Sequence, residues 1–340
     1  MTEGSLDKHF KVALVSVDAE GVPEWVSDNI RAAGVDIDIE ICDNGQDLER
    51  VASDADVVWL FGGGLLLSEQ NKRNFDAIPQ CGAIIRSGSG TDNVAIGEAT
   101  TRGIMVCNTP AATAEEVSDH AIGLYFALVR QIGSQNGLMR DGVWDLSRGH
   151  PYQRVSGRTL GIIGFGHIAR CLVRKMVGFN QIVHVYDPAV DAAVIDDAGC
   201  HASTLDTVLS KSDWVSIHCP LLPATQHLIG EAELRMMKAS AFIINTARGP
   251  IIDEAALVKA LKERWIAGAG LDVFEEEPTP RENPLLSMDN VVSTPHIAGY
   301  SDQTHHNFWS LSVDTVVDLA NGRMPQSCVN GEVTPRWPLK

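Results

Sequence analysis

The chain has 340 residues, of which 44% are hydrophobic and 21% charged, and its formal net charge is −17 at pH 7. This length exceeds what one ordinary hydrophobic core accommodates, so two domains are expected. The acidic balance disfavours nucleic acid and membranes as partners, because both carry negative charge. An anionic ligand would have to meet a local positive site.

Seven cysteines are scattered along the chain without a C-x-x-C pair, so we predict neither a metal site nor a disulfide framework. No apolar run approaches the length of a membrane span. The N-terminus lacks the basic-then-apolar pattern of a secretion signal. A reducing, cytoplasmic location is therefore expected.

The first part of the chain alternates short apolar strands with helical segments, which predicts parallel βαβ units in a flavodoxin-like α/β layer structure. The expected strands are Val12–Val17, Val35–Ile41, Val57–Phe61, Ala83–Arg86 and Ile104–Cys107. A helix is expected at Val22–Ala33 and a long one after Pro110. The glycine-containing stretch Gly133–Ser156 is expected to form an irregular arm.

A second alternation begins at Arg158 and predicts a doubly wound Rossmann domain with six parallel strands. These strands are Thr159–Ile163, Ile182–Tyr186, Trp214–His218, Phe242–Asn245, Ile266–Leu271 and Val291–Ser293. A last helix over Asp302–Ala320 is expected to return to the first domain. We therefore predict a discontinuous domain of residues 1–110 and 302–340 and a second domain of residues 111–301.

The stretch that follows the first strand of the second domain reads as a dinucleotide-binding loop. Gly164, Gly166 and Ala169 occupy the three positions of a G-x-G-x-x-G/A pattern, and a helical segment follows. The glycines allow a tight turn and a close approach of the backbone to pyrophosphate. The next strand ends at Asp187, whose carboxylate can bind the adenosine ribose and would repel a 2′-phosphate. This context favours NAD over NADP.

Three short motifs near the C-terminus each end an apolar run with a charged or titratable group. They are Asn245–Gly249, Asp272–Pro278 and Thr294–His296, and they supply an arginine, a glutamate and a histidine. An arginine fork can hold a carboxylate and polarise a keto oxygen. A histidine can supply a proton near neutral pH, and a neighbouring carboxylate favours its protonated form. The set suits hydride transfer to a 2-oxo acid.

Taken together, these motifs resemble the D-isomer-specific 2-hydroxyacid dehydrogenase family. The matching stretches also include Ser89–Val94, Asn108–Pro110 and Glu115–Val117. The resemblance implies that Arg248 binds the substrate, that Glu277 is the carboxylate partner, and that His296 is the general acid/base. Residues alone leave Glu275, Glu276 and Glu277 as candidates, and the match to the family motif selects Glu277.

The resemblance also implies how small molecules and a second subunit bind. Backbone N–H groups around Ser89 and Gly90 should hold the substrate carboxylate, with Arg248. The expected NAD contacts are Gly164, Gly166, His167, Ile168, Asp187, Cys219, Thr225, Thr246, Ala247, Asp272, Ala298 and Gly299. His167 stands where the family usually has an arginine. A homodimer through the NAD-binding domain and the 133–156 arm is expected.

The choice among relatives rests on single positions. Glu277 beside the histidine argues against a formate dehydrogenase, which has glutamine there, and Ser89 stands where phosphite dehydrogenases carry lysine. No basic residue lies in Phe61–Leu67, where a phosphoglycerate dehydrogenase would need one for the phosphate. A small acid such as glyoxylate, hydroxypyruvate or D-lactate is therefore expected. Phosphoglycerate dehydrogenase remains an alternative.

A different class of protein also stays open. The stretch Pro110–Glu116 is similar to the C-terminal-binding-protein branch, whose members are NAD(H)-responsive corepressors. Such proteins keep the same catalytic residues, so the site alone does not separate the two roles. The chain lacks a long disordered tail and a basic patch, which favours the enzyme.

Overall fold

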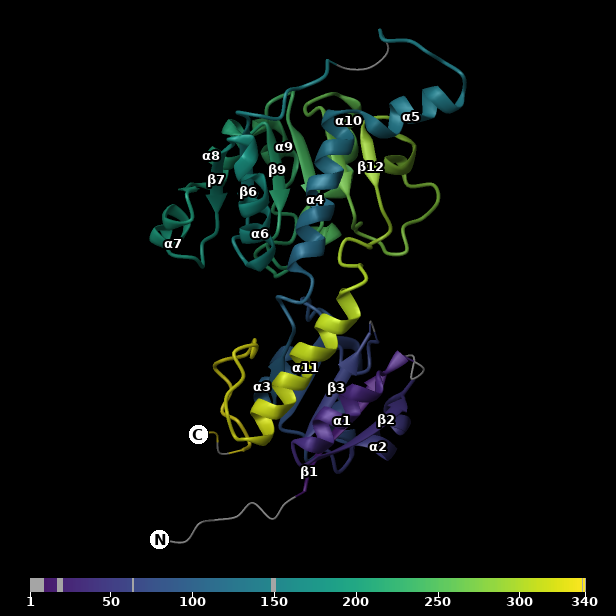
Figure 1. Ribbon diagram of the computed structural model, residues 1–340, viewed down its shortest axis with the longest axis vertical. Helices are drawn as coiled ribbons and strands as arrows, with labels where there is room; N and C mark the ends of the chain where they lie inside the picture. Colours follow the sequence, from purple (N-terminus) through teal and green to yellow (C-terminus); the bar gives the residue numbers. More distant parts are fainter. Residues whose placement is uncertain (1–8, 17–20, 63, 148–150, 338, 340) are drawn as a thin grey trace. The chain divides into compact units, whose positions relative to one another are not determined.

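The computed structural model describes residues 9–16, 21–62, 64–147, 151–337 and 339. The chain divides into two compact units. Unit 1 comprises Met1–Thr113 and Asp302–Lys340, and unit 2 comprises Ala114–Ser301 (Figure 1). Among the described residues, no helix combines the length and apolar character that crossing a bilayer requires.

Unit 1 is built on a parallel sheet of five strands in the order β2-β1-β3-β4-β5, which is the flavodoxin-like order. Its strands are β1 (Phe10–Ser16), β2 (Val35–Ile41), β3 (Val57–Phe61), β4 (Ala83–Ser87) and β5 (Met105–Cys107). Its helices are α1 (Glu24–Ala32), α2 (Gly45–Ala52), η2 (Glu69–Ala77), α3 (Ile96–Thr101) and α11 (Thr304–Ala320). The fold class predicted for this part is confirmed.

The last helix of the chain, α11, packs on the unit 1 sheet beside α1 (Figure 1). Trp309 of α11 stacks on Phe61 with ring centroids 3.8 Å apart and lies edge-on to Trp59 at 5.4 Å. The buried Trp59 indole donates to Ser87 Oγ, which bonds Ser312 Oγ of α11 at 2.9 Å. These contacts join the C-terminal helix to the N-terminal strands.

Unit 2 has a sheet of seven parallel strands in the order β12-β11-β10-β9-β6-β7-β8. They are β6 (Thr159–Ile163), β7 (Ile182–Tyr186), β8 (His201–Ala202), β9 (Trp214–Ile217), β10 (Phe242–Asn245), β11 (Gly268–Leu271) and β12 (Val291–Ser293). The order reverses between β6 and β9, as in the Rossmann fold, where ligands bind beyond the carboxyl ends of the strands.

Helices cover both faces of the unit 2 sheet, and successive strand residues therefore point into two cores. Ile162 and Ile244 face α4 and α6, whereas Ile163 and Ile243 face the side of α8 and α10. The helices of this unit are α4 (Ala114–Val129), α5 (Ile132–Arg140), α6 (His167–Met176), η3 (Val177–Phe179), α7 (Ala192–Asp197), α8 (Leu205–Lys211), α9 (Glu231–Met236), η4 (Gly249–Ile251), α10 (Glu254–Lys262) and η5 (Pro284–Ser287).

Two details differ from the sequence-based expectations. The unit 2 sheet gains the strand β8, whose two residues pair with the edge of β7 and are too few to produce a recognisable pattern. The first part of the expected irregular arm forms the helix α5 (Ile132–Arg140), which buries none of its side chains and so has no periodic apolar face to reveal it. Residues 148–150 of the arm and Val17 of the first expected strand lie outside the described residues.

Candidate functional site

The glycine loop between β6 and α6 is shaped by its neighbours in unit 2. Gly164 has a φ of +90°, and a Cβ there would lie 2.5 Å from the backbone nitrogen of Cys219, so only glycine fits. A Cβ at Gly166 would meet no atom within 4 Å. Open space therefore lies at this glycine, which is the N-cap of α6, where helix N–H groups can receive an anion.

Asp187 joins the end of β7 to the glycine loop. One of its carboxylate oxygens accepts from the N–H of Phe165 at 2.7 Å, and the other accepts from the N–H of Ala189 at 2.8 Å. Each carboxylate oxygen can accept more than one hydrogen bond. The acid is thus fixed beside the loop and can still bind hydroxyl groups.

Two polar side-chain atoms at the same edge of the sheet are buried without a hydrogen-bond partner among the described residues. They are His218 Nδ1, directly after β9, and Thr246 Oγ1, directly after β10. Burial lowers the pKa of His218 to about 4, so its imidazole is neutral at pH 7. Buried polar atoms are rarely left unpaired in a folded protein, so each points to an absent polar partner.

The loop after β10 carries Arg248. The Asn245 side chain accepts from Ala247 N–H at 3.0 Å and donates to Arg248 O at 2.9 Å, which fixes the turn. The next residue, Gly249, is buried, and a Cβ there would lie 1.8 Å from Phe274 O. Glycine at this position therefore lets the arginine loop lie directly against the backbone of the glutamate loop.

The glutamate loop and the histidine loop meet in one short contact. His296 Nδ1 lies 2.6 Å from Glu277 Oε2, and the other oxygen of Glu277 accepts from Phe274 N–H at 3.0 Å. Both side chains are partly exposed, at 49% and 36%. The structure thus separates the three glutamates, because Glu275 bonds His227 instead, at 2.7 Å, and Glu276 is exposed.

The charge on Glu277 is favoured by its surroundings. Burial alone would raise the pKa of Glu277, but the hydrogen bonds from His296 and Phe274 N–H and the positive charge of Arg248 outweigh it and hold the pKa below the usual carboxyl range. A carboxylate accepts hydrogen bonds only, so His296 Nδ1 carries a proton. The free ring nitrogen, Nε2, is then the atom available for proton transfer.

The loop that presents His296 is held by Asp272, whose side chain is fully buried. Its carboxylate accepts from Thr294 Oγ1 at 2.5 Å, Ile297 N–H at 2.9 Å and Ala298 N–H at 2.8 Å. The backbone N–H of His296 donates to Asp272 O at 2.8 Å. These bonds hold His296 at a φ of 54°, in the left-handed region. The buried carboxylate of Asp272 thus positions the loop that presents His296.

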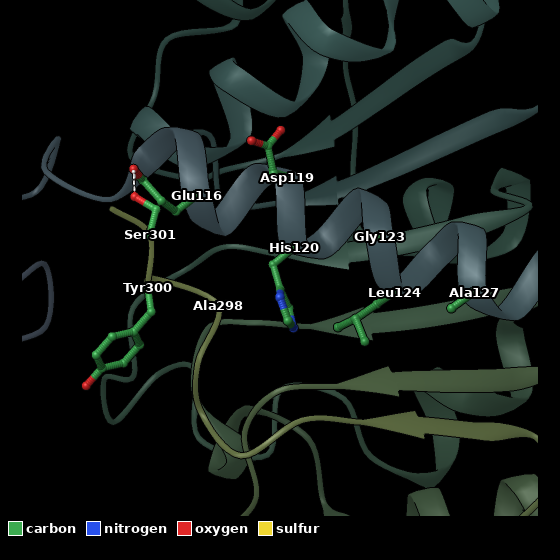
Figure 2. A pocket seen from close by; sticks show the side chains of 9 residues that line it. All are labelled: Glu116, Asp119, His120, Gly123, Leu124, Ala127, Ala298, Tyr300 and Ser301. Atoms are coloured by element: carbon green, nitrogen blue, oxygen red, sulfur yellow. Dashed lines mark hydrogen bonds between the residues drawn. The ribbon is translucent and has the colours of Figure 1, made fainter. Parts of the chain in front are cut away.

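A histidine that the sequence interpretation missed extends this network to α4. His120 Nε2 lies 2.8 Å from Thr294 Oγ1 and 3.6 Å from Asp272 Oδ1. The single proton of Thr294 goes to the carboxylate, so His120 must donate to the hydroxyl. Its imidazole points from α4 into a pocket of about 490 Å³ between α4 and Ala298–Ser301 (Figure 2). Glu116 bonds Ser301 Oγ at the end of this pocket.

Unit 1 contains the other predicted substrate contacts, in the loop after β4. Gly88 accepts from Thr109 N–H and donates to Thr109 Oγ1, and Asn108 Nδ2 donates to Ser89 O at 2.8 Å. Arg86, the residue before the last one of β4, was not singled out by the sequence interpretation. Its guanidinium fills the space beside Gly88, where a Cβ would be 1.2 Å from Nη1.

The predicted residues thus divide between the units. Arg248, Glu277, His296 and Asp272 converge at the carboxyl edge of the unit 2 sheet, and Ser89 and Gly90 lie in unit 1. His167 and Ile168 begin α6, and Gly299 follows Ala298. The hydroxyl of Thr225 bonds Pro220 O at 2.6 Å and Leu222 N–H at 2.7 Å, so it shapes the turn after Cys219.

Comparison with known proteins identifies the family in which this arrangement occurs. Residues 122–298 match the family model described as "D-isomer specific 2-hydroxyacid dehydrogenase, NAD binding domain". A glyoxylate reductase of Korarchaeum cryptofilum is 40% identical over 76% of this chain and 79% of its own length. The chain belongs to the D-isomer-specific 2-hydroxyacid dehydrogenase family. It is accordingly an NAD-dependent oxidoreductase of 2-hydroxy acids.

Solved structures agree with this family assignment. A glyoxylate reductase from Paecilomyes thermophila superposes with a TM-score of 0.82 at 25% identity, covering 95% of this chain and 99% of that one. A D-lactate dehydrogenase from Aquifex aeolicus, in complex with NAD and lactic acid, gives a TM-score of 0.76 at 26% identity and covers 92% and 96%. The predicted family, fold class and cofactor are confirmed.

The residues of unit 2 fit NAD. The open space at Gly166 suits a pyrophosphate at the N-terminus of α6. Asp187 suits the adenosine ribose at the end of β7. The unpaired atoms of His218 and Thr246 follow the adjacent strands β9 and β10, where polar groups of the dinucleotide could supply the missing partners.

Proposed function

We propose that the protein reduces a small, unphosphorylated 2-oxo acid such as glyoxylate or hydroxypyruvate with NADH. The relatives named glyoxylate reductase support this class of substrate. The segment Phe61–Leu67 offers no cation for a phosphate group. Positive charge is instead supplied by Arg248 in unit 2 and by Arg86 in unit 1, which a small carboxylate needs on a chain of net charge −17.

The contact between His296 and Glu277 is the observation that carries the proposal. Glu277 keeps Nδ1 protonated and stabilises the imidazolium, so Nε2 can donate a proton to the oxygen that becomes the hydroxyl of the product. In the reverse direction, the neutral Nε2 accepts that proton. His296 is thus proposed as the general acid/base.

Arg248 and the unit 1 loop are proposed to bind the substrate. The arginine fork would hold the carboxylate and polarise the keto oxygen, which stabilises the negative charge that develops there. Backbone N–H groups at Ser89 and Gly90 would bind the carboxylate as well. Bound NADH supplies the hydride.

The proposed NAD contacts follow the sequence prediction with two changes of role. Gly164, Gly166, His167 and Ile168 would hold the pyrophosphate, and Asp187 the ribose. The rest of the dinucleotide would contact Cys219, Thr246, Ala247, Ala298 and Gly299. Asp272 and Thr225 act instead by positioning the loops that contact it, because their polar atoms bond the protein. Asp187 would also repel a 2′-phosphate, so NADH is preferred to NADPH.

A homodimer through the 133–156 arm of unit 2 is proposed on the basis of exposed apolar side chains. Trp144 is 79% exposed and Leu146 is 90% exposed, and Ile132, Met139 and Tyr152 are each at least 47% exposed. Such a concentration is typical of a subunit interface. The seven free cysteines support the proposed cytoplasmic location.

The test is NADH oxidation at neutral pH with glyoxylate, hydroxypyruvate, pyruvate, 3-phosphohydroxypyruvate and bulkier 2-oxo acids, repeated with NADPH. Fast turnover of one small acid with NADH would support the proposal. Preference for 3-phosphohydroxypyruvate would replace it with the phosphoglycerate dehydrogenase alternative. Saturable NADH binding without turnover of any acid would favour the corepressor-like alternative, which binding of short corepressor-type peptides would then test.

A further inference from the structure

Unit 1 brings together two thiols from distant parts of the chain. Cys107 ends β5 and is fully buried, and Cys328 lies after α11 and is partly exposed. The two residues face each other in an antiparallel bridge, and the Cys328 thiol donates to Asn330 Oδ1 at 3.4 Å. This pair takes no part in the mechanism proposed above.

The hydrogen bonds around the bridge fix the kind of pairing. Asn108 N–H donates to Ser327 O at 3.1 Å, and Val329 N–H donates to Val106 O at 2.8 Å. The bonds thus flank Cys107 and Cys328, which form a non-hydrogen-bonded pair of the antiparallel ladder. In such pairs the Cα atoms are about 4.5 Å apart and the side chains are close. That separation lies within the range that a disulfide bridges, roughly 4.4 to 6.8 Å.

The segment of Cys328 is held firmly against β5. Asn330, which is 1% exposed, accepts from Val106 N–H at 2.8 Å and donates to Ile104 O at 3.0 Å and to Thr100 Oγ1 at 2.9 Å. A cross-link at the bridge would therefore need little movement of either segment.

The two thiols differ in reactivity. The neighbouring Cys107 thiol lowers the pKa of Cys328 against the opposing effect of burial, whereas Cys328 and burial raise the pKa of Cys107. The pKa of each of the other five cysteines is raised, with burial as the largest cause. Since the thiolate is the nucleophile, the partly exposed Cys328 is the thiol suited to react first.

We propose that Cys107 and Cys328 form a reversible oxidation site, at which a hydroperoxide oxidises the two thiols to a disulfide. Cys328 thiolate attacks one peroxide oxygen, the O–O bond breaks, and the sulfur becomes a sulfenic acid while the peroxide is reduced. Cys107 then attacks that sulfur, and water leaves. Two thiols lose two electrons and two protons in total, and hydrogen peroxide becomes two molecules of water. A dithiol reductant reverses the reaction.

The site adjoins the predicted substrate loop. Asn108 follows Cys107 directly, and its side-chain amide holds Ser89 O at 2.8 Å. The disulfide would therefore join the C-terminal segment to the strand end that supports this loop. The oxidation itself is independent of the proposed function.

The experiment uses the full reduced chain and graded hydrogen peroxide, followed by alkylation of free thiols, digestion without reductant and mass spectrometry. We expect free thiols to fall from seven to five, and the peptides of Cys107 and Cys328 to become linked with the loss of two hydrogen atoms. Dithiothreitol should restore all the thiols. The rate should increase with pH as Cys328 ionises. None of these measurements depends on turnover of a 2-oxo acid, so a failure to form the disulfide is distinguishable from failure of the proposed function.

Single-residue variants distinguish the role of Cys328, which reacts with the peroxide, from that of Cys107, which then closes the disulfide. Cys107→Ser should leave Cys328 as a sulfenic acid that dimedone traps, and Cys328→Ser should abolish both the cross-link and the trapped adduct. Cys171→Ser removes the other partly exposed cysteine and should leave the cross-link unchanged. Retention of seven free thiols by the folded wild-type chain would overturn the proposal, as would a disulfide between other cysteines.

Discussion

Two histidine–glutamate pairs use glutamates only two positions apart in the loop after β11. His296 lies 2.6 Å from Glu277, and His227 lies 2.7 Å from Glu275. Both histidines have a φ in the left-handed region, at 54° and 51°, and all four side chains are partly exposed. By distance and residue type alone, the two pairs are equivalent.

Their surroundings differ. Glu275 accepts from Glu254 N–H at the start of α10, and its own N–H donates to the Glu254 carboxylate, so this pair ties the loop to a helix end. The positive charge of Arg248 instead helps to lower the pKa of Glu277, and His296 belongs to a loop anchored by Asp272. The neighbouring arginine and the fixed loop, rather than the histidine–glutamate contact, therefore distinguish the proposed acid/base site from a pair that only holds a loop to a helix end.

The largest expected effect separates the two histidines. His296→Ala should lower kcat for 2-oxo-acid reduction by about 10²- to 10⁴-fold, because the proton donor is lost. NADH affinity, measured by fluorescence titration, should change little. His227→Ala is the matched control and should keep kcat within about threefold while lowering the thermal midpoint, since it removes a surface pair. Equal loss of kcat in the two variants would show that the two histidines do not differ in their role in proton transfer.

Arg248→Lys tests the group that distinguishes the two surroundings. A lysine keeps the charge but lacks the planar fork, so kcat/KM should fall by about 10- to 100-fold, the value of one or two charge-assisted hydrogen bonds. Arg323→Lys, on an exposed arginine paired with Asp318, is the control and should be neutral. Unchanged kcat/KM in Arg248→Lys would remove this residue from substrate binding.

The glutamates should differ in the pH dependence of reduction. The pKa of Glu277 is lowered, so its stabilising contacts are present above the usual carboxyl pKa and are lost as the pH falls through the lowered value. At neutral pH the carboxylate supports the imidazolium that donates the proton. Glu277→Gln should therefore lower kcat, and the loss of kcat that the wild type shows as the pH falls through the carboxyl range should be absent from the variant.

Glu275→Gln is the control for that pH profile, because Glu275 bonds the other histidine. Its profile should coincide with that of the wild type. If both glutamine variants lost this dependence on pH, the general acidity of the loop, and not the contact with His296, would be its cause.

The fold and much of the site could be predicted because each rests on local patterns. Alternating strands and helices specify parallel sheets, and Gly164 and Asp187 occupy recognisable positions after strands. The carboxyl ends of parallel strands share one edge, so motifs far apart in sequence were expected to meet. The short strand β8 and the exposed helix α5 carried too little periodic signal to be predicted.

Other features depend on contacts that no local pattern contains. Three adjacent glutamates look alike in sequence, and only the path of the loop sends Glu277 to His296 and Glu275 to His227. Asp272 follows a strand like the other site residues, and only the fold shows that it is buried beneath the histidine loop. His120 lies on a helix with an apolar face, and its partner Thr294 is 174 residues away.

The smallest expected effect concerns His120, which is proposed as a positioning residue for the His296 loop. His120→Phe removes the donor to Thr294 Oγ1, which should loosen the hydrogen bond of that hydroxyl to Asp272 and lower kcat by about 3- to 10-fold, with KM for NADH unchanged. His120→Gln keeps an N–H donor of similar reach and should restore most of the loss. Asp119→Asn, on the same helix and pairing with Lys175, is the control and should be neutral. Equal loss in the phenylalanine and glutamine variants would mean that His120 fills space and does not hold the loop by hydrogen bonding.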